Sequence, residues 1–233
     1  MNSAVPVKQK RNFSPLVAVI ASPEALRRAK RLRVFPDFFE LRLDAFHRSL
    51  GKVEASISQL RAPLILTARR PEEGGHGQLS LRERTTLLRR FLDFAALVDL
   101  ELLSVRQMAH LVAELRRRKL GLVLSSHDFS GTPSVARLHR LTRRAIPWRP
   151  AIFKLVTRTD TVADLDRLIS FFAQRHRYPF PVAVMGIGKL GSLSRREFDR
   201  AGSALTYVFL DRARIEGQAS LSQLRRVRRA YNP

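Results

Sequence analysis

A single lysine, Lys154, interrupts an otherwise apolar run, Ala151–Val156, and a charge in such a place needs a chemical explanation. An ammonium buried without a partner is costly, and desolvation favours the uncharged amine. An uncharged amine can condense with a ketone or aldehyde to form an imine, whose protonated nitrogen draws electrons from the neighbouring carbon. Lys154 is therefore a candidate imine-forming residue, unless its side chain points outward or reaches the rim of the sheet.

Other side chains that could catalyse a reaction or bind a substrate lie where further apolar runs end. They lie in Glu40-Leu41-Arg42-Leu43-Asp44, Thr67-Ala68-Arg69, Glu72-Glu73, Asp99-Leu100-Glu101, Ser125-Ser126-His127-Asp128 and the segment from Arg214 to Gln218. Each could separately end a strand, cap a helix or make a structural hydrogen bond. Gathered on one rim, they would form an anion-binding pocket with an amine and a proton shuttle. That combination favours imine chemistry on a polyhydroxylated acid.

The apolar runs themselves are of strand length and rich in branched residues. They are Leu16–Ala21, Phe38–Leu43, Pro63–Ala68, Leu97–Leu102, Gly121–Ser126, Ala151–Val156, Pro181–Gly186 and Ala204–Leu210. Continuous apolar strands are typical of a parallel sheet covered by helices. The spacing between runs leaves room for one helix each time.

Helix-start signals lie between these runs. Capping boxes are predicted at Ser80, Ser104, Ser194 and Ser220, each followed three residues later by Glu or Gln. Ser22 is followed by Pro23 and Glu24, which predicts an N-cap, a first-turn proline and a first-turn acid. The segment around Leu111–Leu115 is amphipathic, as expected of a helix on a barrel wall.

Eight strand–helix repeats predict a (β/α)8 TIM barrel, with an open doubly wound sheet as the alternative. No Gly-x-Gly-x-x-Gly motif follows the first run, and the match at Gly186–Gly191 comes late in the chain, which weakens the nucleotide-binding alternative. We expect a single domain, with residues 1–13 as an N-terminal arm and residues 14–233 as the barrel. In a barrel, the polar strand ends would meet at the catalytic face.

Composition excludes several classes of site. The 233-residue chain has no cysteine, which excludes disulfides, thiolate metal sites and a cysteine nucleophile. It shows no signal-peptide pattern and no apolar run long enough to span a bilayer, so we expect a cytoplasmic protein without membrane association. The net charge of +23 is typical of nucleic-acid binders, but the arginines fall in short clusters within or closing predicted helices. We expect a solvated basic surface, and nucleic acid is not the expected partner.

Taken together, the motifs resemble those of the type I 3-dehydroquinate dehydratase family. The similar segments, in family order over nearly the whole chain, are Glu40-x-Arg42-x-Asp44, Thr67-x-Arg69-x-x-x-Glu73-Gly74-Gly75, Asp99-x-Glu101, Ser125-x-His127-Asp128-Phe129, Lys154, Met185-x-Ile187-Gly188-Lys189-x-Gly191-x-x-Ser194-Arg195, Gly202-Ser203 and Gly217-Gln218. The resemblance implies a (β/α)8 barrel, usually a homodimer. It implies a hydro-lyase of the shikimate pathway, and so of chorismate and aromatic amino acid biosynthesis, that converts 3-dehydroquinate to 3-dehydroshikimate and water without metal or organic cofactor.

The resemblance also implies roles for individual residues. Lys154 would form a Schiff base with the C3 ketone, and His127 would remove a C2 proton and later protonate the departing C1 hydroxyl, with Glu73 orienting it. Arg195 would hold the substrate carboxylate. The remaining members of the expected site would bind ring hydroxyls, close a loop or supply apolar walls: Glu40, Arg42, Arg69, Gln218, Phe129, Met185 and Ile187.

The chain departs from the family pattern in the loop before Gln218, where Arg214 and Glu216 replace a common serine and proline. Ile187 also replaces a common methionine in an apolar wall, a mild change. For Arg214, a solvent-facing side chain and a second grip on the carboxylate both remain open. Alternatives to the dehydratase are another imine-forming barrel, such as an aldolase, or a catalytically silent, basic binding protein on the same fold.

Overall fold

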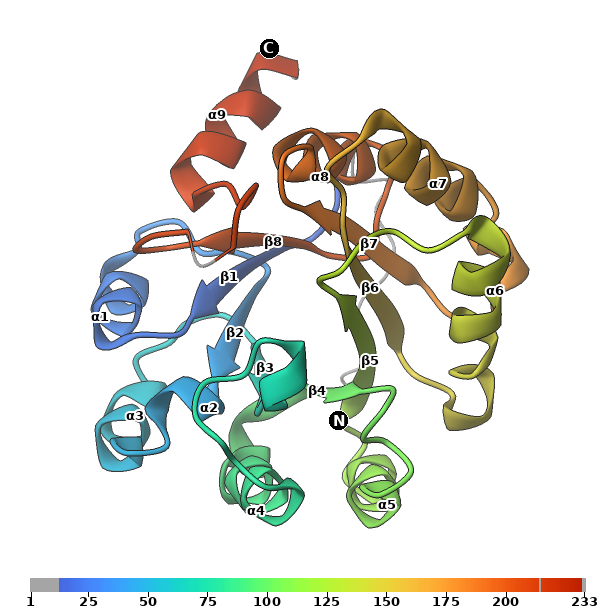
Figure 1. Cartoon of the computed structure of the whole chain (residues 1–233). Helices are drawn as coiled ribbons and strands as arrows, with labels where there is room; N and C mark the ends of the chain where they lie inside the picture. Colours follow the sequence, from blue (N-terminus) through green and yellow to red (C-terminus); the bar gives the residue numbers. More distant parts are fainter. Residues whose placement is uncertain (1–12, 214, 232–233) are drawn as a thin grey trace.

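A computed structural model describes residues 13–213 and 215–231 of the chain. Strands and helices alternate around a ring of parallel strands (Figure 1). The strands are β1 Leu16–Ile20, β2 Phe38–Arg42, β3 Leu64–Thr67, β4 Ala95–Glu101, β5 Gly121–Asp128, β6 Ile152–Arg158, β7 Val182–Ile187 and β8 Thr206–Phe209. All eight predicted strands are therefore confirmed within a few residues. Residues 1–12 of the predicted arm lie outside the described part.

The strands form one sheet in the order β7-β6-β5-β4-β3-β2-β1-β8, with parallel pairing throughout. The seam between β7 and β8 is bridged by the segment before β8: Ala204 donates its backbone N–H to the Val182 carbonyl at 3.0 Å. The Ser203 hydroxyl oxygen accepts the backbone N–H of Val184 at 3.1 Å. The sheet is thus a nearly closed barrel, which confirms the predicted TIM-barrel fold.

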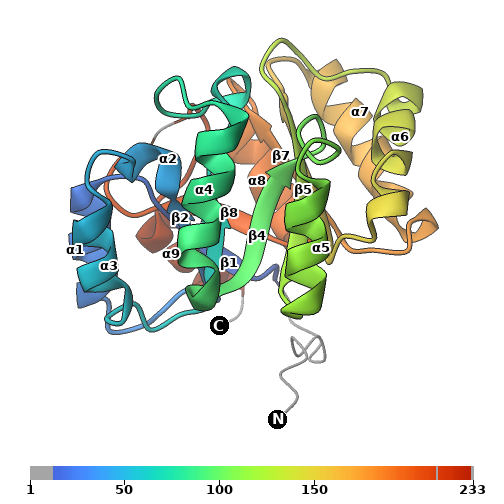
Figure 2. The same cartoon turned by 90° about the horizontal axis from the view of Figure 1, so that it is seen from below.

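Helices cover the outside of the barrel, as α4 and α5 do beside β4 (Figure 2). The α-helices are α1 Pro23–Arg31, α2 Leu43–Phe46, α3 Leu50–Ile57, α4 Leu81–Phe91, α5 Ala109–Arg117, α6 Val135–Arg143, α7 Val162–Ala173, α8 Gly191–Arg200 and α9 Leu221–Tyr231. Single 3-10 turns lie at η1 Pro71–Glu73, η2 Leu92–Phe94, η3 Ile146–Trp148 and η4 Arg175–Arg177.

The predicted helix caps are partly confirmed. Ser22 caps α1, Ser80 forms a reciprocal capping box with Glu83, and Ser220 exchanges the same pair of hydrogen bonds with Gln223. The capping boxes predicted at Ser104 and Ser194 are wrong, as the following helix begins only at Ala109 and Ser194 lies inside α8.

The two misassigned serines serve tertiary contacts. The Ser104 hydroxyl accepts a hydrogen bond from Arg84 at 2.9 Å, and that of Ser194 accepts the Gly186 N–H at 2.9 Å. Each serine therefore ties a strand-end segment to a neighbouring element instead of starting a helix.

Two apolar layers explain why the strands are continuously hydrophobic. On β1, Val17 and Val19 belong to the inner cluster, whereas Leu16, Ala18 and Ile20 pack in the outer layer with the helices. Residues alternate between the faces of a strand, so both faces of this one are buried. Several of the arginine clusters reach the last turn of a helix, where cations interact favourably with the helix dipole, as Arg89 and Arg90 do in α4.

The parallel register brings the predicted site residues to one end of the barrel. Thr67 on β3 is paired with Arg42 on β2 and with Asp99 on β4. Ser125 on β5 is paired with Glu101 on one side and Lys154 on the other. The carboxyl ends of β2 to β6 therefore present charged side chains at one face.

Within the described residues, no helix is long and apolar enough to cross a membrane.

Candidate active site

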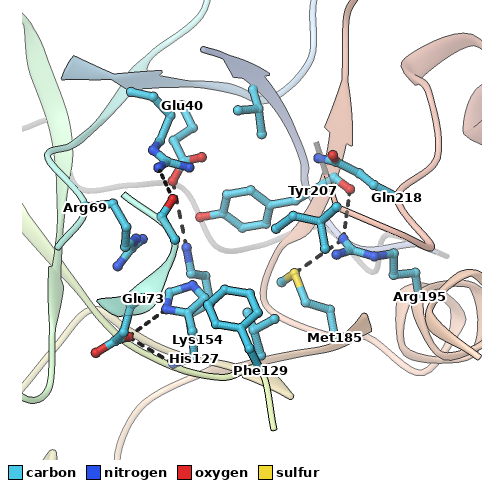
Figure 3. A pocket seen from close by; sticks show the side chains of 15 residues that line it. Glu40, Arg69, Glu73, His127, Phe129, Lys154, Met185, Arg195, Tyr207 and Gln218 are labelled. Carbon is cyan, nitrogen blue, oxygen red and sulfur yellow. Dashed lines mark hydrogen bonds and ion pairs between the residues drawn. The ribbon is translucent and has the colours of Figure 1, made fainter. Parts of the chain in front are cut away.

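One pocket lies at the carboxyl end of the barrel (Figure 3). All of the catalytic and substrate-binding residues expected from the sequence line it, except Ile187. Its lining residues are Glu40, Arg42, Arg69, Glu73, His127, Phe129, Lys154, Met185, Arg195 and Gln218, together with Val19, Gly74, Val156, Tyr207 and Ile215. Ile187, expected as an apolar wall, is 3% exposed and packs in the inner cluster without lining the pocket.

Lys154 on β6 faces the barrel interior and is 3% exposed, so it neither points outward nor reaches the rim. Its Nζ donates to Oδ2 of Asp99 at 2.6 Å and lies 3.8 Å from Oε1 of Glu40. The Nζ also lies 4.5 Å from the ring centroid of Tyr207, within range of a cation–π contact. The premise of an unpaired lysine is therefore wrong, because the partner comes from a strand two positions away in the sheet.

Asp99 is the centre of a buried charge cluster. Its Oδ2 accepts from Nη2 of Arg69 at 2.9 Å as well as from Lys154, and its Oδ1 accepts from the Ser125 hydroxyl at 2.6 Å. Burial alone would raise the pKa of Asp99, but Arg69 and Lys154 outweigh it and hold that pKa well below its usual range. Asp99 is therefore a fixed carboxylate at neutral pH.

Arg69 links Asp99 to a second buried carboxylate. Its Nη1 donates to Glu101 at 3.3 Å and to Ser125 at 2.6 Å. Glu101 also accepts from Nη1 of Arg84 at 2.8 Å. The guanidinium of Arg69 is thus largely occupied by the protein, although the residue was expected to hold ring hydroxyls and does line the pocket.

His127 and Glu73 form the second functional unit. Oε2 of Glu73 lies 2.8 Å from Nδ1 of His127 and accepts the His127 backbone N–H at 3.0 Å. Burial raises the pKa of Glu73 to about 7. Burial, with Arg69 and Lys154 nearby, lowers the pKa of His127 well below its usual value. The imidazole is therefore neutral at neutral pH. An ionised Glu73 holds its proton on Nδ1 and leaves the Nε2 lone pair available as a base.

Arg195 on α8 is a buried cation without a carboxylate partner among the described residues. Its Nη1 donates to the Tyr207 carbonyl at 3.2 Å and contacts Sδ of Met185 at 3.4 Å, while its buried Nε has no hydrogen-bond partner. Burial lowers the pKa of Arg195 to about 10, so the guanidinium stays charged at neutral pH. An anionic ligand group would satisfy this side of the pocket.

Glu40 and Arg42 are oriented by their neighbours. Oε1 of Glu40 accepts the Thr67 hydroxyl at 2.9 Å. Arg42 forms a bidentate pair with Asp44, through Nε at 3.0 Å and Nη2 at 2.8 Å, and also donates to the Gly74 carbonyl at 3.0 Å. Both side chains are thus held at the pocket wall.

The loop after β8 is fixed to the loop after β7. Gly188 donates its N–H to the Glu216 carbonyl at 3.2 Å. Gly191 and Gly217 approach so closely that a Cβ on Gly217, where φ is 83°, would lie 2.7 Å from the Gly191 Cα. Because this contact has no room for a side chain, the loop can bring Ile215 and Gln218 against the pocket. Arg214, whose two alternatives were left open, lies outside the described residues.

Tyr207 and Asp99 were not assigned functional roles from the sequence. The Tyr207 hydroxyl is buried without a hydrogen-bond partner. Burial raises the pKa of this phenol, with Glu40 and Asp99 adding to the effect. A tyrosine inside a predicted strand was the available signal for the first, and the Asp-x-Glu motif for the second. Among the described residues, no group of three or more His, Asp or Glu is arranged to hold a metal ion.

The chain is similar to known proteins over most of its length. Residues 16–232 match the family model described as type I 3-dehydroquinase. A 3-dehydroquinate dehydratase of Thermococcus onnurineus is 30% identical over 213 residues, which cover 91% of this chain and 95% of that protein. A second, from Thermococcus gammatolerans, is 30% identical over 192 residues, 82% of this chain and 86% of that protein.

A solved structure shows the same architecture. The crystal structure of 3-dehydroquinate dehydratase from Geobacillus kaustophilus superposes with a TM-score of 0.84 at 25% identity. The match covers 94% of this chain and 91% of that one.

Proposed function

This chain belongs to the type I 3-dehydroquinase family, and from that membership we propose that it converts 3-dehydroquinate to 3-dehydroshikimate and water through a Schiff base on Lys154. One observation carries the proposal: a buried amine, a neutral histidine with a carboxylate on Nδ1, and an unneutralised arginine line the same pocket.

Imine formation is the first step. The Lys154 nitrogen attacks the C3 carbonyl carbon, and the carbonyl oxygen leaves as water. The protonated imine makes the C2 hydrogens acidic, because it accepts the electron pair that their removal leaves on carbon. Phe129 and Met185 line the pocket and limit the access of water to this nitrogen.

His127 moves the proton in both later steps. Its Nε2 takes the C2 proton, giving an enamine, and then returns a proton to the C1 hydroxyl, which leaves as water while the iminium re-forms. Hydrolysis of that iminium releases the product and the free lysine. Glu73 holds the productive tautomer, since its carboxylate accepts the proton on Nδ1.

Substrate orientation is assigned to the groups around the amine. Arg195 is proposed to take the carboxylate of the substrate through its free Nε and its remaining N–H groups. Glu40 and Arg42, with Arg69 behind them, face the ring hydroxyls, and Gln218 completes the wall from the loop after β8. These steps use protein side chains alone.

The setting of the enzyme is part of the same proposal. The family resemblance supports a homodimer in the shikimate pathway, which leads to chorismate and aromatic amino acids, and the proposal sets the enzyme in the cytoplasm. The basic surface is proposed to be solvated rather than a nucleic-acid site. Sedimentation of the protein alone tests whether it is a homodimer. Sedimentation with duplex DNA at physiological salt tests whether the basic surface binds nucleic acid, and tight, sequence-selective DNA binding would contradict the solvated surface.

The activity is tested by supplying purified protein with 3-dehydroquinate and following the absorbance of the conjugated enone in the product. We expect turnover without added metal, unchanged by a chelator, and no turnover by Lys154→Met. Turnover by the Lys154→Met variant at the rate of the unaltered protein would refute the proposed mechanism, and no turnover by the unaltered protein would refute the function.

A further inference from the structure

The proposed mechanism leaves one charged group next to the reacting nitrogen without a role. Asp99 contacts Nζ of Lys154 at 2.6 Å but does not line the pocket, so it cannot serve by binding the substrate. It is 1% exposed and is also held by Arg69, at the same Oδ2, and by Ser125, at Oδ1. The one partner of Asp99 that reacts in the proposed mechanism is therefore the Lys154 nitrogen.

The charges around this contact are balanced. Three buried cations, Arg69, Arg84 and Lys154, face three buried carboxylates. These carboxylates are Glu40, Asp99 and Glu101. In their charged forms the six groups sum to zero only while Nζ of Lys154 is positive. An unbalanced buried charge costs several kcal/mol, so the cluster favours a cation at that nitrogen.

Condensation with a ketone preserves this balance. An ammonium and a ketone give an iminium and water: two of the three protons on nitrogen leave with the carbonyl oxygen, and the positive charge stays on nitrogen. The charge leaves the nitrogen only in the enamine, when His127 holds the C2 proton, and returns when the C1 hydroxyl departs.

We propose that Asp99 is the counter-ion of the protonated imine formed on Lys154. The inference rests on the proposed function. The carboxylate holds the cation in the resting ammonium and again in the iminium, and so disfavours the neutral imine, which is a poor electron sink. Arg69 shares the same Oδ2 at 2.9 Å and offsets part of its negative charge. The iminium can therefore still accept electrons to form the enamine.

The test compares Asp99→Asn with Glu101→Gln, using 3-dehydroquinate and borohydride. Both variants remove one carboxylate charge from the cluster, and neither residue lines the pocket, but only Asp99 contacts Lys154. For Asp99→Asn we expect kcat to fall by about 100-fold or more, the trapped adduct to fall in parallel, and KM to change by less than about threefold. For Glu101→Gln we expect less than about a tenfold loss in kcat.

Thermal unfolding of both variants separates chemistry from folding. Equal losses of kcat and adduct in the two variants, or a full adduct in Asp99→Asn, would overturn the counter-ion role. If Asp99→Asn does not fold, Ser125→Ala takes its place, because it keeps the carboxylate and removes the hydrogen bond to Oδ1. There we expect a roughly three- to tenfold loss of adduct formation rate, and an unchanged rate would overturn the proposal.

These outcomes differ from failure of the proposed function. If the unaltered protein neither turns over 3-dehydroquinate nor forms an adduct with borohydride, the function itself is wrong. If the unaltered protein does both and Asp99→Asn does so equally well, the function stands and the role of Asp99 is wrong.

Discussion

The two sides of the pocket differ in how the protein satisfies their polar groups (Figure 3). On the side of β2 to β6, Lys154 and Arg69 have buried carboxylate partners. On the side of α8 and β8, the Nε of Arg195 and the Tyr207 hydroxyl are buried without hydrogen-bond partners. On the satisfied side the protein itself supplies the polar partners, whereas on the unsatisfied side a ligand could gain affinity by supplying them.

The largest expected effect comes from removing His127 on the satisfied side. His127→Ala should lower kcat by roughly 10²- to 10⁴-fold, since general acid–base catalysis supplies about that factor. Borohydride should still trap the imine, because Lys154 and its partners are intact. His110→Ala, an exposed histidine on α5, is the control and should leave kcat unchanged. Near-normal turnover by His127→Ala would remove this residue from the mechanism.

The next effect separates the two sides. Arg195→Met should lower kcat/KM by about 10- to 100-fold, the range of one or two charged hydrogen bonds, mainly through KM. The same variant should unfold at a higher temperature, because it removes a buried charge without a counter-ion. Arg69→Met, on the satisfied side, should unfold at a lower temperature because Asp99 and Glu101 each lose one of their buried cationic partners. An equal loss of thermal stability in both variants would show that the two sides do not differ.

A pH profile tests whether ionised Glu73 keeps His127 in the tautomer that can act as a base. The raised pKa of Glu73, about 7, predicts that kcat/KM rises as the pH rises through that value. Below it, a protonated Glu73 would donate to Nδ1 and place the imidazole proton on Nε2, where the base is needed. Glu73→Gln should lower kcat by about tenfold and remove this step from the profile. Glu72→Gln, whose side chain is 67% exposed, should keep it. An unchanged profile in Glu73→Gln would assign the step to another group.

The smallest effect concerns the hydroxyl of Tyr207. Tyr207→Phe should raise the free energy of unfolding by about 1 kcal/mol, since it removes a buried donor without a partner. Tyr178→Phe should lower it by a similar amount, about 1 kcal/mol, because that hydroxyl is hydrogen-bonded to His139. Denaturant unfolding measures both. A loss of stability in Tyr207→Phe comparable to that in Tyr178→Phe would show that the hydroxyl is satisfied in the folded protein.

The fold followed from the sequence because its signals are local. Branched apolar runs such as Leu16–Ala21 are buried on both faces of the sheet and could be assigned without knowing their partners. Two of the four capping boxes were wrong for the opposite reason. Ser104 accepts a hydrogen bond from Arg84 and Ser194 accepts one from the Gly186 N–H, and a pattern of four residues cannot distinguish that use from a cap.

The family resemblance predicted residues that the structure places around one pocket, but it did not predict their charge partners. Lys154 looked isolated because its partner, Asp99, is 55 residues away in the chain. Only the register of β4, β5 and β6 brings the two side chains together. The unpartnered groups of Arg195 and Tyr207 were likewise invisible, because the lack of a neighbour is a property of the folded interior.

Lys154, and no other of the seven lysines in the chain, is proposed to form a covalent imine with 3-dehydroquinate. The direct measurement is mass spectrometry of the protein after borohydride treatment with substrate, followed by digestion to locate the modified lysine. We expect one added ligand mass on the peptide that contains Lys154, and none on Lys154→Met. The same adduct on another lysine of Lys154→Met would contradict the claim.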